Sequence, residues 1–183
     1  MFKSIKEFFS KKDNVITTEV DNSVVITNAE FSHSDFIFNQ IIEGAKSGHF
    51  NSAFVVPQFH LGLKKQIEDS VKSNSCETVN GNVSSRFYVA SINDDLVGFY
   101  WVIRNKPSEF EIYMLSVAPK NRNNGIGSEL LNHSLKSIPK GSTMVARLYG
   151  ASKVMLTMMR KVGFNKSQKQ NAKETVKLSI KTC

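Results

Sequence analysis

A change of hydrophobic period around a glycine-containing turn constrains the fold of this chain more than any other sequence feature. Residues 110–117 (FEIYMLSV) are aromatic, β-branched and apolar, as in a buried strand. The following residues 118–124 (APKNRNN) are polar and contain a proline. An apolar stripe at helical spacing then follows, made of Ile126, Leu130, Leu131, Leu135 and Ile138. The segment 110–138 is therefore predicted to be a strand, a tight turn and a helix.

Hydrophobic period and turn-forming residues also predict the helices and strands in the rest of the chain. Ser34 or Asp35 is predicted to N-cap a helix that ends at Gly48, and residues 74–84 are predicted to be a turn-rich surface loop. The other helices are expected at 58–72 and 152–162, and the strands at 24–27, 86–92, 96–103, 143–149, near 164 and at 175–180. This order indicates an α/β (α+β mixed) fold, with a central mixed, mostly antiparallel sheet of about seven strands flanked by about four helices.

Domain organisation follows from length and composition. The 183 residues suit one domain, assigned to 23–183, preceded by an amphipathic or irregular extension at 1–22. Its stripe of Phe2, Ile5, Phe8 and Phe9 is expected to cover the domain, and it could also join two copies as a homodimer. No run of apolar residues is long enough for a membrane span, and the two distant cysteines form no disulfide framework. These features predict a cytoplasmic protein.

The net charge of +8 is unevenly distributed, because residues 136–183 carry eleven basic residues and one acid, Glu174. A solvated face that also attracts a polyanionic cofactor is the favoured interpretation, and a nucleic-acid surface is the less favoured one.

The turn before the third helix reads Arg122-Asn123-Asn124-Gly125-Ile126-Gly127, which is R-x-x-G-x-G. A helix N-terminus offers free backbone N–H groups and partial positive charge, and glycines allow a diphosphate to approach the backbone. Glycine can also serve such a turn for conformation alone. A dinucleotide-binding fingerprint would need a third glycine where Leu130 stands, and a P-loop would need G-x-x-x-x-G-K-[ST], which is absent.

This segment resembles the acetyl-CoA-binding motif of the GNAT superfamily of N-acetyltransferases, in which a strand ending V-x-P precedes R/Q-x-x-G-x-G/A. Here the strand ends Val117-Ala118-Pro119, and residues 152–164 are similar to the family's second cofactor motif, which ends in Gly163-Phe164. The resemblance implies acetyl-CoA as cosubstrate and no metal. It implies that the cofactor is bound by Leu115, Ser116, Val117, Arg122, Asn123, Asn124, Gly125, Ile126, Gly127 and Ser128, with Ser152 and Met159 also in contact.

Glu111 is the first candidate for a catalytic base, because the resemblance places it where the histone acetyltransferase branch has its glutamate. Strict alternation would put Glu111 on one face with Tyr113, Leu115 and Val117, opposite Ile112 and Met114. A salt-bridged or edge-exposed glutamate is the competing interpretation.

Departures from the family pattern weaken the enzymatic interpretation without excluding it. Met159 replaces a tyrosine that protonates the leaving thiolate, Ser152 replaces a frequent asparagine, and Arg147 replaces a glutamate base of some members. Tyr149 or Ser152 could substitute for the missing tyrosine, although a structural role is favoured for both. His49 and His60, with Phe50, Phe54 and Phe59, fall in a region that commonly shapes the acceptor pocket in the family.

The leading hypothesis is therefore transfer of an acetyl group from acetyl-CoA to a primary amine by direct attack in a ternary complex. The acceptor remains open between a small-molecule amine and a protein amine. Two alternatives remain: a catalytically weak acyl-CoA-binding regulatory module, and an acetyltransferase directed at RNA or aminoacyl-tRNA through the basic C-terminal third.

Overall fold

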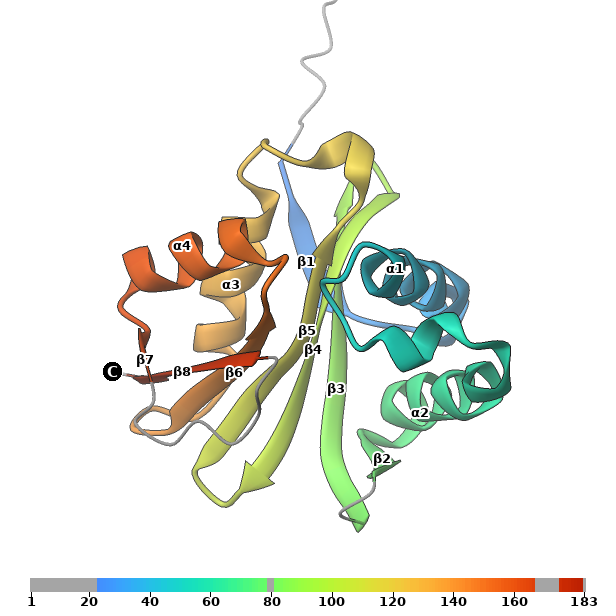
Figure 1. Ribbon diagram of the computed structural model, residues 1–183, viewed down its shortest axis with the longest axis horizontal. Coiled ribbons are helices and arrows are strands. Elements are labelled where there is room, and N and C mark those ends of the chain that lie inside the picture. Colours follow the sequence, from blue (N-terminus) through green and yellow to red (C-terminus); the bar gives the residue numbers. More distant parts are fainter. Residues whose placement is uncertain (1–22, 79–80, 167–174, 183) are drawn as a thin grey trace, which may run out of the picture.

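The computed structural model describes residues 23–78, 81–166 and 175–182, which form one sheet flanked by helices (Figure 1). The predicted extension at 1–22, with its apolar stripe, lies outside the described residues. The elements are β1 (Val25–Asn28), α1 (Ser34–Lys46), α2 (His60–Ser73), β2 (Ser75–Thr78), β3 (Gly81–Ile92), β4 (Asp95–Lys106), β5 (Glu109–Val117), α3 (Ile126–Lys136), β6 (Thr143–Tyr149), α4 (Lys153–Val162), β7 (Asn165–Lys166) and β8 (Thr175–Lys181).

The sheet has the strand order β1-β3-β4-β5-β6-β8-β7, and β2 pairs with β3 beside this path. All neighbouring strands are antiparallel except β5 and β6, which are parallel and are connected through α3. The predicted fold class is confirmed: a mixed α/β chain with one mostly antiparallel sheet and four α-helices among the described residues.

The helices cover both faces of the sheet, with α1 and α2 on one face and α3 and α4 on the other (Figure 1). Each face has its own apolar core. Ile37, Ile67 and Trp101 belong to the cluster under α1 and α2, whereas Leu130 and Met159 belong to the cluster under α3 and α4. Burial of these apolar stripes is the main stabilising contribution to each layer.

The strands predicted at 86–92 and 96–103 are joined by a tight turn. Asn93 and Asp94 have φ angles of 50° and 66°, and β3 and β4 pair directly across them from Ile92 to Asp95. Two residues with positive φ make the turn whose twist suits a two-residue hairpin, and Asn and Asp tolerate this backbone better than most residues.

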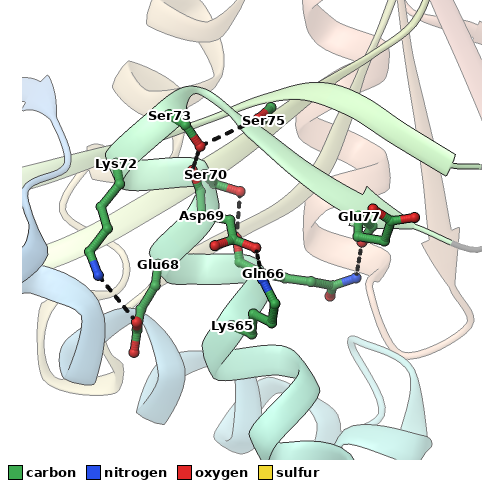
Figure 2. Close-up of polar contacts among 9 residues, drawn as sticks. All are labelled: Lys65, Gln66, Glu68, Asp69, Ser70, Lys72, Ser73, Ser75 and Glu77. Carbon is green, nitrogen blue, oxygen red and sulfur yellow. Dashed lines mark hydrogen bonds and ion pairs between the residues drawn. The ribbon is translucent and has the colours of Figure 1, made fainter.

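The prediction of a surface loop at 74–84 is wrong, because β2 lies in this segment and pairs antiparallel with the first residues of β3. Cys76 of β2 is buried, and Asn74 reverses the chain just before this strand with a φ of 53°. Side chains of α2 hold β2 in place: Gln66 Nε2 donates to the carbonyl of Glu77 at 2.7 Å, and the hydroxyls of Ser73 and Ser75 lie 3.4 Å apart (Figure 2). These tertiary contacts outweigh the turn-forming composition of the segment.

The N-cap predicted at Ser34 or Asp35 is also wrong. A short 3₁₀ turn, Phe31–His33, precedes α1, and His33 occupies the N-cap position without a side-chain cap bond. Glu30 and His33 cap each other's backbone at the start of that turn instead. The predicted end of the helix is supported, since Gly48 has a φ of 74° and donates its N–H to Ala45.

A β-bulge at Tyr113 breaks the alternation of β5. Ile112 pairs with Val102 and Met114 pairs with Trp101, so Tyr113 has no partner on β4. As a result Ile112 packs in the α3–α4 core and Met114 in the α1–α2 core. The strict alternation predicted for this strand is therefore wrong beyond Tyr113: Glu111 lies on the α1–α2 face, whereas Leu115 and Val117 pack on the α3–α4 face.

The parallel strands β5 and β6 stay together for only four residue pairs. Their register runs from Glu109 opposite Thr143 to Ile112 opposite Ala146 and then stops. Both strands continue, to Val117 and Tyr149 respectively. The sheet is therefore split at its centre, and the unpaired edge of β5 from the bulge onward faces an opening.

Candidate functional site

The opening between β5 and β6 is a cavity of about 840 Å³. Its α3–α4 half is lined by the turn before α3 and by the methionines of α4, Met155, Met158 and Met159. Its α1–α2 half is lined by Glu111 and Tyr113 of β5, Arg147 and Tyr149 of β6, and the segment after α1 with His49, Phe50, Asn51 and Phe54. The split sheet thus connects the two faces of the domain through one cavity.

The turn before α3 has the backbone that an anion site requires. Asn123 and Gly125 have φ angles of 66° and 81°, so two left-handed residues bend the chain sharply just before the helix. Gly125 is the N-cap of α3 and provides no side-chain cap. Such alternation of backbone conformation turns successive N–H groups toward one side, where the positive end of an eleven-residue helix adds to their field.

The amides of this turn are available to a ligand. Within the described residues, no hydrogen bond uses the backbone N–H groups of residues 123–127, whereas the flanking amides of Arg122 and Ser128 bond to the carbonyls of Pro119 and Gly125. In the segment 122–128, which is predicted to bind the cofactor, five consecutive backbone amides are therefore unpaired and the two at its ends are hydrogen-bonded. Arg122, Asn123, Gly125, Ile126, Gly127 and Ser128 line the cavity, and Asn124 does not.

Asn121 is a polar residue at this end of the cavity that the sequence did not single out. Its Oδ1 is buried and has no hydrogen-bond partner among the described residues. A buried amide oxygen without a partner costs free energy, so this side chain is poised for a ligand contact. No sequence signal distinguishes Asn121 from its neighbours Asn123 and Asn124.

The edge of β5 continues the site away from the turn. Leu115, Ser116 and Val117, which the sequence predicts to bind the cofactor, all line the cavity. The Ser116 hydroxyl donates to Gln40 of α1 at 3.1 Å, and the Val117 carbonyl accepts from Nε of Arg122 at 3.1 Å. The Val117 carbonyl is therefore already engaged, and Arg122 is anchored to the strand with the rest of its guanidinium exposed.

Glu111 lies at the point where β5 and β6 separate, and its side chain is 2% exposed. Its carboxylate accepts from Nδ2 of Asn105 at 2.8 Å and from Nη1 of Arg147. Burying a carboxylate is tolerated when it is paired and hydrogen-bonded, which both partners ensure. The competing interpretation of a salt-bridged glutamate is thus supported for the free protein, and the same carboxylate also lines the cavity.

The structure also brings together two residues far apart in sequence, His49 and Ser152. His49 Nδ1 lies 3.2 Å from the Ser152 hydroxyl, and both line the cavity. The same contact region places Gly48 against Ala151, so the segment after α1 meets the N-terminus of α4 across the split sheet. Tyr149 lines the α1–α2 half beside them, and the buried Met159 lines the α3–α4 half.

Tyr113 projects at the bulge, edge-on to Trp101 with ring centroids 4.8 Å apart. Burial raises the pKa of its phenol, and the Glu111 carboxylate raises it further. Tyr113 is therefore a protonated hydrogen-bond donor at neutral pH.

The ion pair of Glu111 with Arg147 is, besides Asn121, a feature of this site that the sequence did not reveal. Parallel pairing sets Glu111 opposite Val145, so Arg147 lies two residues further along the same face of β6. Because that register depends on the whole sheet, no local pattern reveals the pair.

The described residues contain no cluster of three metal-ligating side chains, and no helix among them is long and apolar enough to cross a bilayer.

Comparison with known proteins finds a family match for part of the chain. Residues 83–166 match the family model of the acetyltransferase (GNAT) domain, which spans β3 to β7 and includes the split strands and the turn. No curated protein matches the chain at a significant level.

Solved structures share the fold at low sequence identity. The PaiA N-acetyltransferase of Thermoplasma acidophilum, in complex with coenzyme A, is 15% identical with a TM-score of 0.65, over 88% of this chain and 99% of that chain. The spermidine N-acetyltransferase of Vibrio cholerae, in complex with CoA and spermine, is 13% identical with a TM-score of 0.62, over 86% and 94%. The ribosomal-protein-S18-alanine N-acetyltransferase of Escherichia coli is 12% identical with a TM-score of 0.58, over 86% and 91%.

The family model covers β5, the turn before α3, β6 and α4, which line much of the cavity, but not the segment after α1 that lines the rest. The shared fold extends over 86–88% of the chain. Residues 83–166 therefore match an acetyltransferase (GNAT) domain, and this match together with the shared fold indicates an acyltransferase.

Proposed function

We propose that this protein transfers an acetyl group from acetyl-CoA to a primary amine by direct attack in a ternary complex. The observation that carries the proposal is the row of unpaired amides at residues 123–127, which open on a cavity that continues along β5 to Glu111. A diphosphate fits this row, because an anion satisfies several N–H groups at once and interacts favourably with the helix dipole.

The remaining residues of the α3–α4 half suit the rest of the cosubstrate. The unpaired edge of β5 at Leu115 and Ser116 offers backbone groups to the amide-containing pantetheine arm, as an additional strand would. Arg122 and the orphaned Asn121 side chain flank the diphosphate position. Met155, Met158 and Met159 give the arm an apolar wall.

Acetyl-CoA supplies the thioester: its acyl carbon forms a bond to the amine nitrogen, and its carbon–sulfur bond breaks to release a thiolate. Glu111 is proposed to receive the proton that the amine loses, since it is the one carboxylate among the described residues that line the cavity. The hydroxyl of Ser152, hydrogen-bonded to His49, is a candidate hydrogen-bond donor that would stabilise the thiolate in the cavity where Met159 replaces the tyrosine. A thiolate needs little help to depart near neutral pH, because the thiol pKa is about 8.5.

The test is calorimetric titration with coenzyme A, followed by thiol release from acetyl-CoA across a panel of amines. Binding together with amine-dependent thiol release supports the proposal. Tight binding without release under any acceptor would favour the regulatory module, which the Glu111–Arg147 ion pair and Met159 make the second candidate. Failure of coenzyme A to bind would refute both.

A further inference from the structure

The acceptor side of this cavity carries a pattern of charge that restricts the chemistry of the amine. Glu111 is the one acid among the described cavity-lining residues, and both of its oxygens already accept hydrogen bonds. A polyamine has several cationic centres, and only one of them could lie beside Glu111, because the described lining residues offer no second carboxylate. The acceptor half therefore does not select for multiple positive charges.

Arg147 gives the same region an available cation. Its side chain is 46% exposed and lines the cavity, and one guanidinium nitrogen, Nη1, bonds to Glu111. Among the described residues it has no other hydrogen-bond partner, so the remaining N–H groups of its planar fork face solvent or a ligand. Lys177 lies directly opposite Arg147 on β8 and adds positive potential on the same face of the sheet.

Apolar walls complete the acceptor half. Phe50, Phe54, Tyr113 and Tyr149 line it, and Phe50 rests directly on Gly44 of α1, where any side chain would collide with its ring. Aromatic surfaces of this kind bind apolar side chains rather than extended polar chains.

We propose that the acceptor is a free α-amino acid with an apolar side chain. The adjacent carboxylate and guanidinium of Glu111 and Arg147 match the ammonium and carboxylate that one amino-acid Cα holds side by side. In this arrangement Arg147 binds the carboxylate of the acceptor, the amine lies beside Glu111, and the side chain packs on Phe50 and Phe54. This inference rests on the proposed acetyl transfer and names its substrate class.

The experiment compares acceptors that differ only at the carboxylate: L-phenylalanine, L-phenylalaninamide and phenethylamine, with leucine and methionine and their amides as a second series. Only the free acids can form a charge-assisted hydrogen bond from their carboxylate to Arg147. Their kcat/KM for thiol release should therefore be about 10- to 100-fold higher than that of the amides and of phenethylamine. Equal rates for acid and amide, or a preference for spermidine, would overturn the inference.

Arg147→Gln separates carboxylate recognition from damage to the neighbouring Glu111. The quantity to compare is the ratio of kcat/KM for the free acid to kcat/KM for its amide. A disturbed Glu111 lowers kcat/KM for both compounds and leaves this ratio unchanged, whereas loss of carboxylate binding lowers the ratio. The ratio should therefore fall to about one in Arg147→Gln, and Arg147→Lys should restore part of it. Arg160→Gln, which removes the same charge from an exposed position outside the cavity, should leave the ratio unchanged. A ratio that survives in Arg147→Gln would refute the assignment.

A binding measurement keeps the inference testable even without turnover. Calorimetry of L-phenylalanine and its amide with the CoA-loaded protein should show the acid binding about tenfold or more tightly. If coenzyme A fails to bind, the proposed function is wrong. If it binds and the acid shows no advantage over the amide in rate or affinity, the acceptor assignment alone is wrong.

Discussion

In the α3–α4 half of the cavity, the polar groups that face a ligand are mainly backbone amides from five consecutive residues, 123–127. In the α1–α2 half they are side chains from three separate segments, contributed by β5, β6 and the chain after α1. The first half is a product of local conformation, and the second exists only where the sheet brings distant residues together. The proposed cosubstrate site therefore depends on local conformation, whereas the proposed acceptor site depends on the tertiary arrangement of distant segments.

The largest expected effect comes from Glu111→Gln, which removes the proposed base from the α1–α2 half while keeping its shape. A general base contributes about 10²- to 10⁴-fold, so kcat should fall by that order. Affinity for coenzyme A should remain nearly the same, because the amides of residues 123–127 are untouched. Steady-state rates over a range of pH, with calorimetry of coenzyme A, test both statements. If the pH–rate profile keeps its shape and height, Glu111 has no part in the mechanism.

Gly125→Ala probes the α3–α4 half through its backbone. A left-handed residue other than glycine costs about 1–2 kcal/mol, although the new methyl group has open space around it. Relaxation of the turn should misalign its amides and weaken coenzyme A binding about tenfold, without changing the preference among acceptors.

Gly141→Ala is the matched control for this prediction. Gly141 has a φ of 77°, open space around its Cβ position and no place in the cavity lining. It should lose comparable stability in thermal denaturation and retain full affinity for coenzyme A. Equal loss of affinity in both variants would mean that the turn before α3 has no special role in binding.

Gly44→Ala probes the opposite half through packing. A Cβ at this position would lie 2.4 Å from two ring carbons of Phe50, so the ring must move into the cavity or α1 must shift. Such overpacking costs about 1–3 kcal/mol, against about 1 kcal/mol gained from the better helix propensity of alanine. The acceptor kcat/KM should fall about three- to tenfold through KM, with coenzyme A affinity retained.

Gly62→Ala offers the comparison for Gly44. Gly62 is an exposed position inside α2 with no atom within 4 Å of an added Cβ. This variant should gain up to about 1 kcal/mol in stability and keep its kinetics. If Gly44→Ala is as stable and as active as Gly62→Ala, Phe50 does not shape the acceptor half.

The smallest effect concerns a residue outside both halves, His133 of α3. Burial lowers its pKa below 6.5, and nearby Lys136 lowers it further. Its Nδ1 lies 2.8 Å from the Tyr100 hydroxyl, and the ring of Tyr88 packs edge-on against it. Because the unfolded chain then binds the proton more readily than the native one, stability should decrease as pH falls through about 6.5. Thermal melts should show a shallower decrease in His133→Gln, and identical slopes would contradict the assignment.

The local elements could be predicted from the sequence because each depends on neighbouring residues. Period and turn chemistry gave β6 its bounds, gave α3 its glycine-bearing start and placed the reversal at Asn93 and Asp94. The segment at 74–84 could not be predicted in this way, since Gln66 of α2 and pairing with β3 stabilise a strand whose own composition favours a turn.

The sequence by itself determined the motif of residues 122–127, because left-handed backbone at a glycine and free amides at a helix start are properties of a short contiguous segment. Only the tertiary structure decided what faces that motif. The bulge at Tyr113 moved Leu115 and Val117 to the face opposite Glu111, and the register of two parallel strands paired Glu111 with Arg147. Register and bulges are set by the packing of a whole sheet, where one residue of slip reverses every face, so they cannot be deduced from a strand taken alone.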